Sequence, residues 1–292
     1  MKIKRSLGSK IFDTFNYLFL GLFACSTILP FLYVLACSFS SEKEILERPF
    51  YIIPRSIQFA AYKYVFSSPT LPRAFLISVF ITAAGAATAM FFTLTLAYPL
   101  SKKNLVGRNV LLTLISFTLV FGGGMIPTFL VVKSLGFLNK YWALILPGAI
   151  STWNLLVVKN FFQEIPQEME DSARVDGCSA LGTFIKIVLP LSMPVIATFT
   201  LFYAVGYWND YRGALLYMTD NKKWPLQLVL RQIVLMAAGN IDGATFDEAY
   251  TQPPLQGSRN AVIVFGTVPI LLVYPFLQKH FVKGIMIGAI KG

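Results

Sequence analysis

Residues 74–101 read AFLISVFITAAGAATAMFFTLTLAYPLS and contain no Asp, Glu, Lys, Arg or His. A helix rises about 1.5 Å per residue, so a helix of this length exceeds the hydrocarbon core of a bilayer, which is about 30 Å thick. A charged side chain inside that core is costly, and this run avoids all of them. The stretch is therefore typical of a helix that spans a membrane.

Five further runs of similar character follow from the same scan, and the six together are residues 14–41, 74–101, 109–132, 141–158, 187–209 and 260–278. Because the backbone in lipid must satisfy its own hydrogen bonds, each run is predicted to be helical. The sequence thus predicts an all-α integral membrane protein with six transmembrane helices. Prolines are expected to kink or end these helices at Pro30, Pro127, Pro147, Pro194 and Pro269.

Composition agrees with a membrane protein: 55% of the 292 residues are hydrophobic, 13% are charged, and the mean hydropathy is +0.63. The formal charge of +11 is spread over short loops rather than gathered on one face, which disfavours nucleic-acid binding. Cys25, Cys37 and Cys178 indicate neither a disulfide framework nor a metal site.

The basic N-terminus resembles that of a signal peptide, and residues 34–37 resemble a lipoprotein cleavage box. The first apolar run is too long for the apolar region of a signal peptide, so an uncleaved span is predicted.

An even number of spans places both termini on one side of the membrane. The short segments on that side are dense in Lys and Arg, which predicts that it is the cytoplasm. The chain then forms a single transmembrane domain over residues 1–292. It has a cytoplasmic loop at 159–186, an entry segment at 42–73 on the opposite side, and a long extracytoplasmic loop at 210–259.

The sequence lacks the residues that several other functions require. None of the six runs holds an ionisable side chain, which disfavours an ion-coupled carrier, although sodium can be bound by backbone and hydroxyl oxygens alone. No phosphate-binding P-loop motif is present, so another chain would have to hydrolyse any ATP. A membrane enzyme would need a nucleophile with a base, or metal ligands, and the runs supply neither.

Gly122–Gly124 suits close packing, a bend or a gate, and His280 suits an interfacial anchor.

The polar loop at 159–186 predicts structure of its own. Pro166 suits a first helical position, Glu168 suits the helix N-terminal turn by its charge, and Gly177 suits a C-terminal cap with positive φ. A helix of about ten residues is therefore expected, with Ser179 capping a second helix that continues into the fifth run. A helix this short is marginal alone, so it should pack either on its own subunit or on a partner.

Within this loop, Asp171-Ser172-Ala173, Asp176-Gly177, Ile187 and Leu189-Pro190-Leu191 resemble the signature cytoplasmic loop of ABC importer permeases, in which Glu-Ala-Ala is followed by Gly and by Ile-x-Leu-Pro. Asp171 and Ser172 depart conservatively from that pattern. Residues 121–127, 207–209, 224–227 and 283–292 are similar to the carbohydrate-importer permeases related to the maltose permease. Within these, the likeness is to the LplC/YtcP-like branch, associated with oligosaccharides of polysaccharides such as alginate or pectin.

The resemblance implies a type I ABC importer permease fold in the bacterial plasma membrane. It implies a transporter subunit rather than an enzyme, with no cofactor of its own, working with a second homologous permease, an extracytoplasmic solute-binding protein and two ATPase subunits that bind ATP and Mg²⁺. The substrate would be an oligosaccharide, possibly acidic. The residues implied to couple to the ATPases are Glu170, Asp171, Ser172, Ala173, Asp176 and Gly177. Lys291 and Gly292 are further candidates for ATPase contact.

A substrate path is suggested by aromatic and amide side chains near the outer end of the fifth run, since sugars stack on rings and exchange hydrogen bonds with amides. The candidates are Tyr203, Tyr207, Trp208, Asn209 and Tyr211. The alternative is an aromatic belt at the membrane interface. For an acidic sugar, the nearby Arg212, Lys222 or Lys223 could supply a cation, or these residues could contact the binding protein or lie in a solvated loop.

Overall fold

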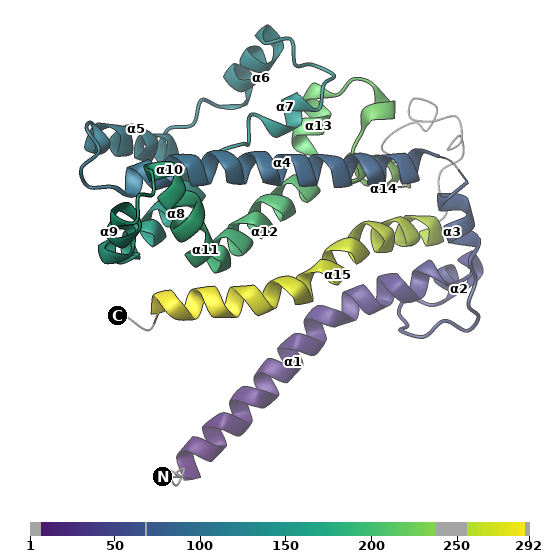
Figure 1. The fold of residues 1–292 in the computed structure, drawn as a ribbon. Helices are drawn as coiled ribbons and strands as arrows, with labels where there is room; N and C mark the ends of the chain where they lie inside the picture. Colours follow the sequence, from purple (N-terminus) through teal and green to yellow (C-terminus); the bar gives the residue numbers. More distant parts are fainter. Residues whose placement is uncertain (1–6, 68, 238–255, 290–292) are drawn as a thin grey trace. The chain divides into compact units, whose positions relative to one another are not determined.

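The computed structural model describes the backbone of residues 7–67, 69–237 and 256–289 (Figure 1). Regular structure in these ranges is helical and includes no β-strand, as the sequence predicted. The chain divides into two compact units. One comprises Met1–Pro69 with Gln232–Val268, and the other comprises Thr70–Arg231 with Pro269–Gly292. Each unit is described separately.

The first unit is built on α1 (Leu7–Ser38), whose most apolar 18-residue window contains no buried residue, whereas Ala36 and Cys37 near its end are buried. That exposure in an apolar helix suits lipid contact. Two short helices follow, α2 (Glu42–Glu47) and α3 (Ala60–Val65), together with the start of α15 (Gln256–Ala289). The small residue Gly257 of α15 lies against the side chains of Ile45 and Ala61. The loop after α2 is fixed by the buried Glu44 carboxylate, which accepts hydrogen bonds from Arg48 Nη1 at 2.7 Å and Arg55 N at 2.9 Å.

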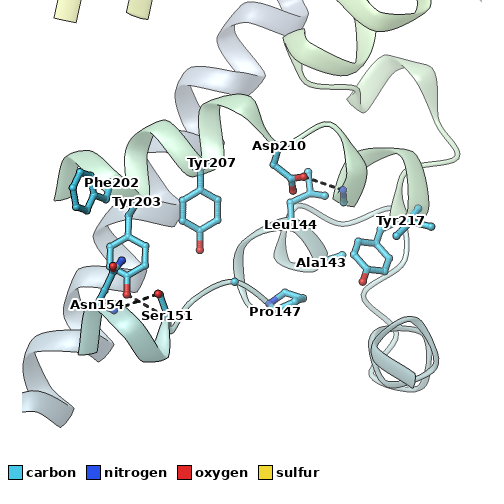
Figure 2. A pocket seen from close by; sticks show the side chains of 14 residues that line it. Ala143, Leu144, Pro147, Ser151, Asn154, Phe202, Tyr203, Tyr207, Asp210 and Tyr217 are labelled. Atoms are coloured by element: carbon cyan, nitrogen blue, oxygen red, sulfur yellow. Dashed lines mark hydrogen bonds between the residues drawn. The ribbon is translucent and has the colours of Figure 1, made fainter. Parts of the chain in front are cut away.

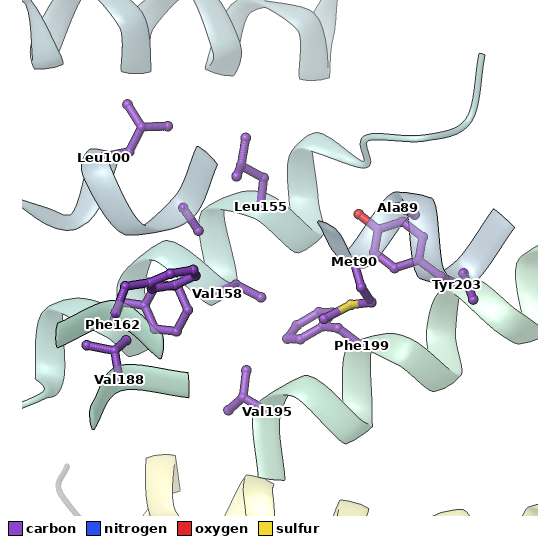
Figure 3. Close-up of a cluster of buried hydrophobic side chains, with 13 residues drawn as sticks. Ala89, Met90, Leu100, Leu155, Val158, Phe162, Val188, Val195, Phe199 and Tyr203 are labelled. Atoms are coloured by element: carbon purple, nitrogen blue, oxygen red, sulfur yellow. The ribbon is translucent and has the colours of Figure 1, made fainter. Parts of the chain in front are cut away.

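The second unit is organised around α4 (Thr70–Ser101), and Figure 1 shows α8 (Thr152–Glu164) and α12 (Met193–Asn209) beside it. Small residues on α4, among them Ala86 and Ala89, let the neighbouring helices approach closely. Leu155, Val158 and Phe199 complete the centre of this core (Figure 3).

Two of the predicted runs are broken helices. The run 109–132 forms α5 (Arg108–Val120) and α6 (Met125–Ser134), which meet at 116°. Gly124 at that bend has φ +82°, so a bend is the feature that the glycine cluster provides. The run 187–209 is preceded by α9 (Gln167–Val175) and α10 (Ala180–Thr183). It continues from η1 (Phe184–Val188, a π-helical turn) through α11 (Leu189–Leu191) into α12, with a bend of 81°.

The run 141–158 does not form one helix, which corrects the expectation of a continuous span there. It forms α7 (Trp142–Ile145), a non-helical stretch, and then α8. Pro147 lies in the break, where it lacks an N–H and restricts the residue before it, so its predicted role as a kink or end is confirmed. Ser151 begins α8 again by accepting a hydrogen bond from Asn154 N at 3.4 Å.

By length and composition, α1 and α4 can each cross a membrane, and the two bent pairs can do so if each pair counts as one span. Helix α15 covers the last predicted run, 260–278. The loop after α12 contains α13 (Arg212–Tyr217), η2 (Asn221–Lys223) and the start of α14 (Leu226–Ala237), while residues 238–255 lie outside the described chain. Asn139 ties this loop to the connection after α6, since its Oδ1 accepts from Thr219 N at 2.8 Å and Asp220 N at 3.1 Å.

Candidate coupling helix and cavity

Helix α9 is the short helix that the polar loop predicted. It starts after Pro166 and runs for nine residues. Its end is closed by two backbone hydrogen bonds, from Gly177 N to Arg174 O at 3.0 Å and from Cys178 N to Ala173 O at 2.9 Å. Together with the φ of +82° at Gly177, these bonds form a Schellman motif. The predicted cap at Ser179 is also present, because its Oγ accepts from Gly182 N at 3.1 Å.

The six predicted coupling residues divide into an inward pair and an outward set. Glu170 and Ala173, one turn apart, are buried against the rest of the unit. Asp171, Ser172, Asp176 and Gly177 are exposed. Asp171 accepts a hydrogen bond from Gln167 Nε2 at 3.2 Å and lies 3.7 Å from Arg174 Nη1, so its contacts stay within α9. The outward side also exposes apolar side chains, with Met169 43% and Val175 88% accessible. The outward side of α9 therefore presents both charged and apolar side chains to its surroundings.

Sequence reasoning missed the residue that Glu170 contacts. Lys102, directly after α4, donates from Nζ to both carboxylate oxygens of Glu170. The Glu170 side chain is 2% exposed and that of Lys102 is 25% exposed. A buried carboxylate needs such a counter-charge, because desolvation without one is very costly. The two residues are 68 positions apart, and nothing in the local pattern links them.

Aromatic side chains pack around this ion pair. Lys102 Nζ lies 4.6 Å from the ring centroid of Tyr98, a cation–π distance. The Tyr98 ring stacks on Phe184 with centroids 4.8 Å apart, and Phe162 meets it edge-on at 6.3 Å. The end of α4, the end of α8 and the turn η1 are thus joined beside α9.

A cavity of about 630 Å³ lies among α7, α8, α12 and α13, and Figure 2 shows its lining. Its aromatic residues are Phe202, Tyr203, Tyr207 and Tyr217, and its polar side chains come from Ser151, Asn154, Asp210 and the tyrosines. Among the described residues that line it, Asp210 is charged and none is basic. Its volume lies within the range of small-molecule sites.

The two tyrosines of α12 also satisfy the backbone where the fourth run is interrupted. Tyr207 donates its hydroxyl to Ile145 O at 2.9 Å, at the end of α7. Tyr203 accepts from Ser151 N at 3.1 Å, at the start of α8, and its hydroxyl also bonds Thr93 Oγ1 at 2.7 Å. The hydroxyls therefore hold the broken span together, while the rings face the cavity (Figure 2).

The five predicted path residues are not all brought together. Tyr203 and Tyr207 line the cavity, but the other three do not. Trp208 is buried and meets Phe75 edge-on at 5.9 Å. Asn209 donates to Val205 O within its own helix, and Tyr211 lies under the Arg231 guanidinium, which is 5.7 Å from its ring centroid.

The predicted cations lie elsewhere as well. Arg212 and Lys222 are exposed, and Lys223 Nζ donates to Asn139 O at 3.1 Å, so none of the three lines the cavity. Asp210 lies among the predicted path residues in the sequence, so it is the cavity residue that the sequence could most readily have predicted.

In the part of the chain that the structure describes, no cluster of three or more His, Cys, Asp or Glu could hold a metal. The side chain of His280, and Lys291 and Gly292, fall outside the described residues.

The fold and site define a class: an all-helical protein with long apolar helices that can cross a membrane, a short capped helix with an exposed outer face, and an open pocket lined by aromatic and polar side chains. Residues 3–287 match the family described as "binding-protein-dependent transport system inner membrane component". The chain belongs to this family. It is therefore a membrane-embedded permease subunit of a transport system and not an enzyme, as predicted.

Individual relatives agree with this assignment. The chain is 57% identical to protein LplC of Bacillus subtilis over 98% of this chain and 96% of the relative. It is 51% identical to the polygalacturonan/rhamnogalacturonan transport system permease protein YtcP of the same organism, over 98% and 100% of the two chains. Its structure resembles a chain in the crystal structure of a bacterial ABC transporter that imports the acidic polysaccharide alginate, with a TM-score of 0.87, 31% identity and coverage of 96% and 100%. The predicted type I permease fold is thereby confirmed.

Proposed function

We propose that this chain is one of two permease subunits in an ATP-driven importer of oligosaccharides, and that α9 is the helix through which ATPase subunits act on it. The observation that carries the proposal is α9 itself: a nine-residue helix, closed at Gly177, that exposes Asp171, Ser172 and apolar side chains within the loop resembling the permease signature. Short helices gain stability from docking, which suits insertion into a groove on a partner.

The assembly follows from this role. Two ATPase subunits would bind ATP and Mg²⁺, a second homologous permease would complete the pathway, and an extracytoplasmic binding protein would deliver substrate. This chain would bind no cofactor. Both termini and α9 would be cytoplasmic. Closure of the ATPases would displace α9 and convert the pathway from outward-facing to inward-facing, which is a rigid-element transition between two states.

The substrate class is an oligosaccharide, and the names of the relatives favour an acidic one. Aromatic rings, an amide and hydroxyls around the cavity suit the faces and hydroxyls of sugar rings. Because the described lining includes Asp210 and no basic residue, the carboxylates of an acidic oligosaccharide would have to be neutralised by the second permease or by the binding protein.

Paired glycine substitutions test the role of α9. Gly177 and Gly136 both have positive φ, +82° and +66°, and at both an added Cβ would meet nothing within 4 Å. Gly177→Val and Gly136→Val therefore impose similar backbone strain, about 1–2 kcal/mol each. In the reconstituted transporter with its binding protein, Gly177→Val should abolish uptake and substrate-stimulated ATP hydrolysis while the protein still inserts, whereas Gly136→Val should retain both.

Normal coupled uptake by Gly177→Val would reject α9 as the coupling element. The competing function, a carrier driven by an ion gradient, makes a separate demand. The purified chain alone in vesicles should accumulate labelled oligogalacturonide under an imposed gradient if it is such a carrier, and should not do so if ATPase partners are required.

A further inference from the structure

The inward side of α9 is held by a charge rather than by apolar packing alone. Glu170 is 2% exposed, so its carboxylate depends on polar partners from the end of α4: Lys102 Nζ donates to both of its oxygens, and the Tyr98 side chain also hydrogen-bonds to it. Two other ion pairs among the described residues of this unit are much more accessible: Arg174–Asp171 at 52% and 56%, and Lys223–Asp220 at 42% and 38%. Exposed pairs of that kind contribute little, whereas breaking a buried pair is strongly unfavourable.

Lys102 is not a mobile surface lysine. Its ammonium lies over the Tyr98 ring at 4.6 Å, and Tyr98 is stacked on Phe184, so its position is set by the end of α4. A displacement of α9 that keeps Glu170 paired must therefore carry the end of α4 with it.

Helix α4 in turn contacts both cavity tyrosines. Thr93 Oγ1 is 2.7 Å from the hydroxyl of Tyr203. At Gly85 the backbone lies so close to the Tyr207 ring that an added Cβ would be 2.8 Å from three of its carbons. The same helix thus leads directly into Lys102, the partner of Glu170, and through these contacts it also supports the cavity wall.

We propose that the Lys102–Glu170 ion pair is the positioning link that makes α4 follow α9, so that force applied to α9 reaches the cavity. Neither residue touches substrate, and both act through α4. The proposal rests on the proposed function, since it assumes that a partner moves α9.

The measurement uses the complete purified transporter in vesicles, with its own ATPase and second permease subunits and its binding protein, and follows uptake of labelled oligogalacturonide together with ATP hydrolysis. Lys102→Met and Glu170→Gln should each lower uptake per ATP hydrolysed about tenfold, a change typical of interaction energies between contacting residues. The double variant should be no worse than either single variant, because each already removes the same link. Lys102→Arg, which keeps the charge, should restore the ratio.

The exposed neighbour Lys103 provides the matched control, and Lys103→Met should behave as wild type. An unchanged uptake-to-ATP ratio in both single variants overturns the proposal. If the single variants do not assemble, Lys102→Met combined with Glu170→Met removes both charges: normal coupling in that variant overturns the proposal, and assembly with a lowered ratio supports it. Absence of ATP-dependent uptake in the wild-type complex would instead reject the proposed function.

Discussion

At the scale of single residues, Gly85 determines how closely α4 and α12 approach. Any side chain there would meet the Tyr207 ring at 2.8 Å, a distance that forces the ring or the helix to move. Gly85→Ala should therefore destabilise the protein by about 1–3 kcal/mol, the usual cost of overpacking a core. Thermal unfolding of the purified transporter, followed for this subunit, should show a lowered midpoint.

Gly21 supplies the control, since it lies inside α1 and an added Cβ would meet nothing within 4 Å. Gly21→Ala should leave the midpoint unchanged or raise it slightly, because Ala is the better helix former. Equal shifts in the two variants would show that the close approach of α4 and Tyr207 does not limit stability.

The predictability of single residues depended on how local their chemistry is. The positive φ of Gly177 and the cap at Ser179 were predicted correctly because each depends on neighbours within a few positions. The Lys102–Glu170 pair was not predicted, because it joins residues that only the tertiary fold brings together. The resemblance to the permease loop predicts Glu170 and Asp171 together as coupling residues, and burial separates them, since Glu170 is buried while Asp171 is exposed.

At the scale of helices, the interruption between α7 and α8 is the feature that hydropathy could not reveal. Residues 141–158 are apolar enough to predict one span, and composition does not report where backbone hydrogen bonds stop. Within this run, Pro147 was the residue that predicted a kink or an end of the helix. The two tyrosines proposed as sugar contacts do line the cavity, but their hydroxyls are used to satisfy the broken backbone, a role that ring chemistry alone did not suggest.

Tyr203→Phe tests whether the hydroxyl stabilises the start of α8. The substitution removes the acceptor of Ser151 N–H and the partner of Thr93, and a polar group left unpaired in a protein interior costs about 1–3 kcal/mol. The amide of Ser151 should then exchange with deuterium about tenfold faster or more, while amides in the middle of α4 keep their rates. Tyr17→Phe, at a side chain that is 73% exposed, should change neither. An unaltered Ser151 rate would mean that the break is held by packing instead.

At the scale of the whole molecule, the arrangement of loops across the bilayer follows from charge density and from the number of spans, and it remains a prediction. The family match establishes a multi-pass membrane protein, and α4 is long and apolar enough to cross by itself. A spanning α4 would place the segments on either side of it, residues 42–67 and 102–107, in opposite compartments. The orientation predicted from charge density places the first outside and the second in the cytoplasm.

Single cysteines on the two segments can decide this orientation. Leu46 is 73% exposed before α4 and Val106 is 94% exposed after it, so Leu46→Cys and Val106→Cys should both react readily once Cys25, Cys37 and Cys178 are replaced by Ala. In intact cells a membrane-impermeant maleimide should label the cysteine at 46 and not the one at 106, and in inside-out vesicles the result should reverse. Because a single span separates the sites, labelling of both from one side would refute α4 as a span. The opposite pattern would place α9 outside the cell, where no ATPase could reach it.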